Sequence, residues 1–317
     1  MDTKNILRLH ILMGKLSSVG SIPVTHQAFA FLLIALVIYV ALTPSGSREG
    51  FAGAKNGRFE SVRGNQVYDN LYASMYDPLF VRKERIVHEI NSIYGRAGLE
   101  KGMHVLDVGS GTGHLCGSLA KDGISCTGMD KSAAMVQKAK ENYPDVPFVQ
   151  GDATLAAHNY FGKFDVVSCM YFTFYEMKNK EQFLRNCFHW LKPGGLLFIH
   201  MADPEKLDPI LPVGNVLISI NPQNFAEKRI TTTRAVFENK EYKSDLQSKG
   251  GDNYLLVETI IDRRNGNVKR LERELVMPAV EKATKMAQSV GFVAEGGAEM
   301  QDCGYVGQYI YVFRKRN

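Results

Sequence analysis

The chain of 317 residues carries 38 Lys and Arg against 33 Asp and Glu, which gives a formal net charge of +5 at pH 7. Because both signs are spread along the sequence, this mild charge argues against a dedicated nucleic-acid-binding protein, which would concentrate basic residues in a stripe. A hydrophobic fraction of 45% is sufficient for a large buried core. The five cysteines form no Cys-x-x-Cys pair, so we expect reduced thiols rather than a disulfide framework or a metal site.

An apolar segment near the N-terminus is the first predicted element. Residues 28–42 contain no charged side chain, and extension back to Ile22 gives a stretch close to the ~20 residues that a membrane-spanning helix needs. We expect an N-terminal tail over 1–21 and a single-pass membrane anchor over 22–42. A cleaved signal peptide, giving a secreted protein, and an organelle transit segment remain alternatives. Flanking Lys and Arg residues are too evenly distributed to set the orientation in the membrane.

Residues 43–58 are rich in Gly, Ser and Pro and predict a flexible linker. The folded domain is expected over 59–317, and it begins with two helices. The first carries Tyr68, Tyr72 and Tyr76 at every fourth position, hence on one face, and is expected to end at Pro78. The second is expected over 82–94.

Beyond residue 100, apolar strand-like segments alternate with amphipathic helical segments. The strands are expected over 103–108, 124–129, 146–149, 164–170 and 195–200, and the clearest helices over 131–142 and 180–191. This alternation is typical of βαβ units, and therefore of a parallel sheet with helices on both faces.

After Pro204 the pattern changes to strands without helices between them, over 230–237, 254–261 and 268–277. Asn265-Gly266 between the last two is typical of a tight hairpin turn. We expect residues 205–277 to form an antiparallel insertion that covers the carboxyl ends of the parallel strands. A helix over 279–290 and strands over 292–299 and 307–313 complete the prediction.

The strand at 103–108 leads into a loop whose glycines predict a ligand close to the backbone. The loop residues are Gly109, Ser110, Gly111 and Gly113. His114 occupies the place of the last glycine in the dinucleotide pattern, and no Gly-Lys-Ser/Thr follows, so neither a pyrophosphate nor a triphosphate is expected. Asp107, just before the loop, suits a ligand that carries an amino group.

Two further carboxylates follow neighbouring strands. Asp130 ends the second strand, where an acidic side chain can accept hydrogen bonds from both ribose hydroxyls, and Asp152 follows the third. Either residue alone is equally compatible with a helix cap or a turn cap. Three carboxylates at the ends of three consecutive strands, around one glycine loop, favour a ligand site instead.

These segments resemble, in order and spacing, the class I S-adenosylmethionine-dependent methyltransferases, most strongly over about residues 65–200. The matching segments are Asp107–Gly113, Gly128–Asp130, Gly151–Ala153, Phe164–Val167 and Leu191–Leu196. The resemblance implies a Rossmann-like seven-stranded sheet and S-adenosylmethionine as cofactor. It places Asp107 and the glycine loop at the methionine moiety and Asp130 at the ribose. It places Met129, Asp152 and Ala153 around the adenine, and Tyr72 on a helix that folds over the cofactor.

In such a site the sulfonium supplies the driving force, so the protein has to align the acceptor and exclude water. Residues that follow the fourth and fifth strands are candidates for contact with the acceptor. They are Tyr171, Thr173, Tyr175, Glu176, His200 and Asp203. We select Tyr171, His200 and, from the tyrosine helix, Tyr76 as catalytic candidates. His200 can act as a base near neutral pH, although a buried core histidine is the alternative interpretation.

The sequence therefore predicts a membrane-tethered methyltransferase that acts on a small polar acceptor. The Asn/Asp-Pro-Pro-Tyr/Phe motif typical of methylation at amide or base nitrogens is absent after the fourth strand, so a nucleic-acid substrate is not expected. Two alternatives remain, namely a protein or lipid-associated acceptor and a non-catalytic S-adenosylmethionine-binding protein.

Overall fold

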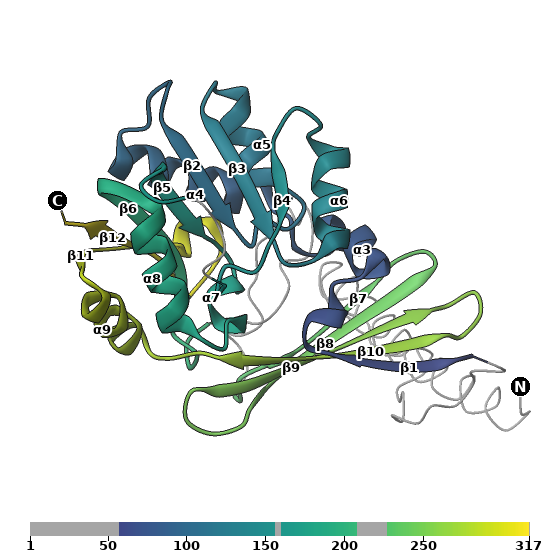
Figure 1. Ribbon diagram of the computed structural model, residues 1–317. Helices are drawn as coiled ribbons and strands as arrows, with labels where there is room; N and C mark the ends of the chain where they lie inside the picture. The colour runs from purple at the N-terminus through teal and green to yellow at the C-terminus, as the bar shows by residue number, and fades with distance from the viewer. Residues whose placement is uncertain (1–56, 156–159, 208–226, 317) are drawn as a thin grey trace, which may run out of the picture. The chain divides into compact units, whose positions relative to one another are not determined.

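The computed structural model of the chain describes residues 57–155, 160–207 and 227–316. All of them belong to one compact unit, Ala54–Asn317. Within this unit, a seven-stranded sheet with helices on both faces is joined to a five-stranded sheet (Figure 1).

The seven-stranded sheet carries the predicted parallel core. Its order is β11 (Phe292–Glu299), β12 (Gln308–Lys315), β6 (Leu191–Ala202), β5 (Phe164–Cys169), β2 (His104–Val108), β3 (Ser125–Asp130) and β4 (Phe148–Gln150). Strands β2 to β6 run parallel, whereas β12 is antiparallel to both β6 and β11. The predicted Rossmann-like sheet is confirmed. The strand order reverses at β2, which is where open α/β sheets bind their ligands.

Successive strand residues point to opposite faces, and each face has its own hydrophobic core. Leu106, Val167 and Leu197 pack with helices α8 (Lys180–Trp190) and α9 (Val280–Val290). Their chain neighbours Val105, Val166 and Leu196 belong to the core under α4 (Lys83–Ala97), α5 (His114–Lys121) and α6 (Ala133–Asn142). The short helices α7 (Thr173–Glu176) and η3 (Gln301–Cys303) follow β5 and β11.

The five-stranded sheet contains the predicted insertion and two strands that the sequence did not predict. Its order is β1 (Phe59–Arg63), β10 (Val268–Val276), β9 (Asn253–Asp262), β8 (Lys240–Ser248) and β7 (Thr232–Val236). The pairs among β7 to β10 are antiparallel, whereas β1 is parallel to β10. The first part of the predicted insertion, residues 208–226, lies outside the described residues.

The tyrosine helix is α3 (Asn70–Phe80), preceded by the turn η1 (Gly64–Val67). Pro78 does not end this helix, as the sequence predicted, but lies inside its last turn. The proline lacks only the N–H that would bond the Ser74 carbonyl, and the helix closes with a bond from the Val81 N–H to the Asp77 carbonyl. Tyr68 precedes the helix, so the three tyrosines do not form one helical stripe.

Two predictions from the sequence have to be corrected. In residues 57–155, 160–207 and 227–316, no helix combines the length and the apolar character that crossing a membrane requires. The predicted fold is therefore corrected to the two sheets and their helices, and residues 22–42, for which a transmembrane helix was predicted, lie outside the described residues. Cys116 and Cys126, on neighbouring α5 and β3, form a disulfide with their Cα atoms 5.3 Å apart, so these two are not free thiols.

A buried ion pair ties the five-stranded sheet to α3. Glu258 on β9 is fully buried and accepts hydrogen bonds from the Arg273 Nε and Nη2 atoms at 3.0 and 2.8 Å. The same carboxylate accepts from the hydroxyls of Tyr72 on α3 and Tyr242 on β8. Glu258 is the fully buried one of the two carboxylates that pair with Arg273, the other being Glu176, and a buried guanidinium that loses a carboxylate partner is costly.

We predict that Glu258→Ala lowers the free energy of unfolding by roughly 3–5 kcal/mol, since it removes one partner of a buried pair. Urea denaturation measures this change. The matched control is Glu181→Ala, which breaks the exposed Glu181–Arg185 pair and is expected to cost less than about 1 kcal/mol. Equal losses in the two variants would contradict a special role for the buried pair.

Candidate functional site

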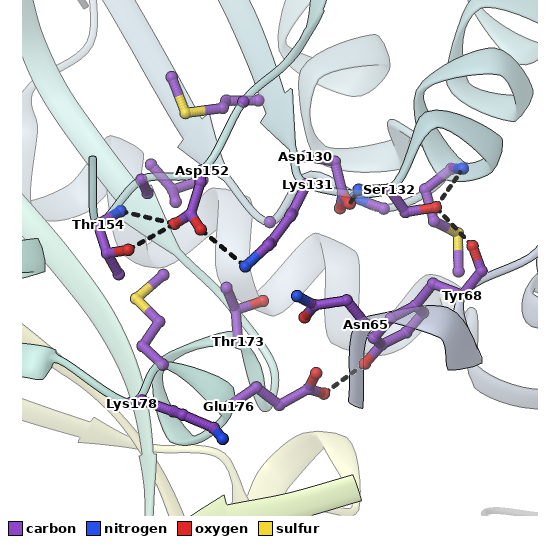
Figure 2. Close-up of a pocket in the computed structure, with 18 of the residues that line it drawn as sticks. Asn65, Tyr68, Asp130, Lys131, Ser132, Asp152, Thr154, Thr173, Glu176 and Lys178 are labelled. Atoms are coloured by element: carbon purple, nitrogen blue, oxygen red, sulfur yellow. Dashed lines mark hydrogen bonds and ion pairs between the residues drawn. The ribbon is translucent and has the colours of Figure 1, made fainter. Parts of the chain in front are cut away.

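A cavity of about 500 Å³ lies at the carboxyl ends of β2, β3 and β5, and η1 and α3 form part of its wall (Figure 2). Its lining comes from the glycine loop, the end of β3 and residues 151–154, together with Thr173, residues 176–179, Tyr68 and Tyr76. The size is within the range of about 300–1,000 Å³ that is usual for small-molecule sites. This position is also where the strand order reverses.

Gly109 and Gly111 of the glycine loop line the cavity, whereas the predicted Ser110 and Gly113 do not, and the loop needs all three of its glycines. Gly109, Gly111 and Gly113 have φ angles of +71°, +54° and +86°, a region that favours glycine. A Cβ on Gly109 would also collide with Thr173. The N–H groups of Gly109 and Ser110 donate to the Met129 carbonyl at 2.7 and 3.0 Å, which fixes the loop against β3.

Asp130 is held at the end of β3 by two backbone donors. Its Oδ2 accepts from the Gly111 N–H and its Oδ1 from the Ser132 N–H, both at 2.9 Å. Burial nevertheless raises the pKa of Asp130 to about 6, against the lowering effect of these hydrogen bonds. Asp130 lines the cavity, and because each oxygen of a carboxylate can accept more than one hydrogen bond, the group can also accept from a ribose diol.

The adenine side predicted from the sequence also gathers at the cavity. Met129 and Ala153 line it and are buried, so they provide apolar contact for a base. Asp152 forms an ion pair with Lys131 at 2.7 Å and accepts from the N–H and hydroxyl of Thr154 (Figure 2). Burial alone would raise the pKa of Asp152, but the hydrogen bonds from Lys131 and Thr154 lower it.

Asp107 comes just before the glycine loop in the chain. It is not a lining residue of the cavity, whereas its neighbour Val108 is. The carboxyl is 3% exposed and accepts a hydrogen bond from the Ser168 hydroxyl at 2.8 Å. Burial raises its pKa to about 7. Asp107 is thus next to the cavity, but its carboxyl is not exposed in the cavity wall.

Of the three tyrosines, Tyr68 and Tyr76 line the cavity and Tyr72 does not. A Cβ placed on Gly111 would lie 3.7 Å from the ring of Tyr76, so this ring covers the glycine loop. The hydroxyl of Tyr72 donates to Glu258 at 2.9 Å, and its ring is buried. The prediction that Tyr72 contacts the cofactor is therefore wrong, because its hydroxyl faces the five-stranded sheet.

Tyr171 and His200 also lie outside the cavity lining. His200 is 2% exposed, and burial, reinforced by the charge of Arg85, lowers its pKa to about 3. The imidazole is therefore neutral and a very weak base, which overturns the prediction of His200 as a base near neutral pH. The guanidinium carbon of Arg85 lies 4.5 Å from the centroid of the Tyr171 ring. Tyr171 is therefore corrected from a catalytic candidate to a residue that packs against Arg85.

Sequence reasoning missed two residues that matter at the site. Tyr68 was assigned to the tyrosine helix but not to the cavity, and Arg273 was not considered. Arg273 Nη1 lies 2.7 Å from Oε1 of the cavity residue Glu176. The local signal is the alternation of β10, which puts Arg273 on the same buried face as Leu271 and Leu275 but does not indicate its partner.

Comparisons with known proteins identify the class of this domain. Residues 105–195 match a family model described as "Methyltransferase domain". The chain is 36% identical over 121 residues to the ubiquinone biosynthesis O-methyltransferase of Escherichia coli O127:H6. This alignment covers 35% of this chain and 50% of that protein. The chain thus matches about half the length of the curated relatives.

Solved structures agree on the fold. An S-adenosylmethionine-dependent methyltransferase from Clostridium acetobutylicum superposes with a TM-score of 0.58 at 16% identity, over 78% of this chain and 99% of that one. The amino pentose methyltransferase CalS10 from Micromonospora echinaspora, solved with S-adenosylmethionine bound, gives a TM-score of 0.54 at 18% identity, over 78% and 98%.

Residues 105–195 therefore carry a methyltransferase domain, and the chain shares its fold with S-adenosylmethionine-dependent methyltransferases, so the resemblance predicted from the sequence is confirmed. S-adenosylmethionine is the cofactor named for the two solved structures. The residues present fit it, since the glycine loop allows close approach, Asp130 suits the ribose, and Met129 and Ala153 suit the base.

We predict that Asp130→Ala weakens binding of S-adenosylmethionine at least tenfold, about 1.4 kcal/mol, because the ribose loses its acceptor. Calorimetric titration of the full chain measures this. Asp145→Ala, at an exposed turn, is the control and is expected to bind within twofold of the wild type. Equal affinities of the wild type and Asp130→Ala would contradict the ribose assignment.

A second prediction concerns pH and Asp107. A folded-state pKa of about 7, above the ordinary value near 4, means that its stabilising contribution is complete below pH 4 and is lost as pH rises through 7. Asp107→Asn abolishes this titration. Relative to the wild type, the variant is therefore expected to gain about 2 kcal/mol in unfolding free energy between pH 5.5 and 8.

Urea denaturation at the two pH values measures the gain, with Asp145→Asn as the control for the loss of a surface carboxylate. A difference between Asp107→Asn and the wild type that stays constant with pH would refute the raised pKa.

Proposed function

We propose that this chain is an S-adenosylmethionine-dependent methyltransferase that transfers a methyl group to a small polar acceptor. The observation that carries the proposal is the convergence, around one cavity, of the glycine loop, Asp130 and the apolar residues Met129 and Ala153. The curated relatives, whose name describes O-methylation, support methyl transfer as the activity. They match only part of this chain, so their acceptor is not assigned to it.

The cofactor supplies an electrophilic methyl on a positively charged sulfur, so the residues of this chain have to bind, orient and exclude water. Asp130 fixes the ribose, and the glycine loop lets the backbone approach the methionine end. Tyr76 covers the loop from the side of α3, and Tyr68 closes the wall beside it. None of these residues has to act as a nucleophile.

The wall on the side of the five-stranded sheet favours a small acceptor over a protein segment. There Tyr68 donates a hydrogen bond to Glu176, and Arg273 from β10 supports the carboxylate from behind. This contact joins Tyr68, which follows η1, to α7 in the cavity wall, so an extended polypeptide that entered on this side would have to break it.

The proposal is tested by incubating the full chain with S-adenosylmethionine and a set of small amines and hydroxyl compounds. We expect formation of S-adenosylhomocysteine that depends on the acceptor, measured by mass spectrometry, and a loss of at least tenfold in kcat/KM for Asp130→Ala. Cofactor binding without any acceptor-dependent turnover would instead favour a non-catalytic binding protein.

A further inference from the structure

Glu176 is the acidic side chain that α7 places in the cavity wall. It is the last residue of the short helix α7, which follows β5, and it lies on the same side of the cavity as Thr173 and Asn65 (Figure 2). Its side chain is 25% exposed, and its charge contributes to the raised pKa of Asp130, after the larger effect of burial. The carboxylate therefore faces the same space as the predicted ribose site.

One oxygen of this carboxylate is occupied and the other is available. Oε1 accepts from the Tyr68 hydroxyl and from Arg273 Nη1. Among the described residues, no donor bonds Oε2. A carboxylate oriented by two donors on one oxygen presents the other in a fixed direction, which is the requirement for recognising a hydrogen-bond donor.

The charges around Arg273 do not balance. This arginine pairs with Glu258 at 2.8 Å and with Glu176 at 2.7 Å, so one cation serves two carboxylates and the group has a net charge of −1. Glu258 is fully buried, and Glu176 is the member that reaches the cavity. The excess negative charge is therefore presented to whatever binds there. A low-dielectric wall of this sign favours a cation.

We propose that Glu176 is the acceptor-recognising residue, that it binds an amino group, and that the substrates are therefore small amines. Tyr68 and Arg273 are positioning residues, since they act through Glu176. This inference rests on the proposed function and adds the class of acceptor to it. The name of the curated relatives, which describes O-methylation, does not decide the acceptor of this chain, because they match only part of it.

The chemistry balances with Glu176 in this position. An ammonium group of the acceptor gives one proton to Oε2, which frees the nitrogen lone pair. That lone pair forms the new bond to the methyl carbon, while the carbon–sulfur bond breaks and its electron pair stays on sulfur. The proton on Glu176 passes to water, and the methylated amine carries the positive charge that the sulfonium has lost.

The test uses three cofactor-shaped probes with the full chain. S-adenosylhomocysteine lacks the methyl group, S-adenosylmethionine carries the sulfonium, and sinefungin carries an amino group where the methyl stands. We expect the wild type to bind sinefungin at least tenfold more tightly than S-adenosylhomocysteine. In Glu176→Gln this preference should fall to less than threefold, while affinity for S-adenosylhomocysteine and its ratio to S-adenosylmethionine change less than twofold.

The matched control is Glu181→Gln, which neutralises an exposed carboxylate on α8 and is expected to keep the wild-type preference. If Glu176→Gln does not fold, Glu176→Asp replaces it. Drawing the carboxylate back by one methylene is then expected to lower the preference at least threefold.

Other outcomes overturn the inference. An unchanged preference for sinefungin in the Glu176 variants would show that the carboxylate does not face the transferred methyl. A parallel loss of affinity for S-adenosylmethionine would assign Glu176 to the sulfonium of the cofactor. Methylation of oxygen alone in the acceptor screen would exclude amines. Failure of the wild type to bind any of the three probes would refute the proposed function itself.

Discussion

The contact between the glycine loop and the end of β3 is the constraint on which the site depends. The Met129 carbonyl accepts from the N–H groups of Gly109 and Ser110, and the Asp130 carboxylate accepts from Gly111. These bonds draw two parallel strands together at the point where the strand order reverses. The side-chain carboxylate that would hold the ribose is thus also the one that shapes the loop, so cofactor binding and loop geometry are coupled through one residue.

The cofactor half of the fold was predictable because its signals are local. Strands β2, β5 and β6 contain apolar runs, helical patterns follow β2, β3 and β5, and the glycines and Asp130 fall at strand ends. Hydrophobic period and turn chemistry act over a few residues, and the parallel order then brings the strand ends to one edge. Consequently Gly109, Gly111, Met129, Asp130 and Ala153 all line the cavity as expected.

The remainder was not predictable because it depends on contacts between distant parts of the chain. Strand β1 is formed by pairing with β10, which lies about two hundred residues away in the chain. Strand β8 is largely polar and therefore has no strong periodic signal. The even spacing of Tyr68, Tyr72 and Tyr76 suggested one helical face, but Tyr68 precedes the helix, so the assignment to Tyr72 failed. For His200, the sequence gives the residue type but not the burial that lowers its pKa.

The difference between local signals and long-range contacts also explains how much the match to known proteins indicates about the site. Asp130, the glycine loop and Glu176 all fall within the matched residues 105–195, whereas Tyr68 and Arg273, which orient Glu176, come from either side of them. A carboxylate on the part of the fold that the family model covers therefore obtains its direction and charge balance from parts that this model does not cover. Replacing the flanking donors alters how an acceptor is recognised without disturbing the Asp130 contact with the loop. For this reason the matched domain indicates the class of reaction, whereas the acceptor has to be argued from the contacts between the two sheets.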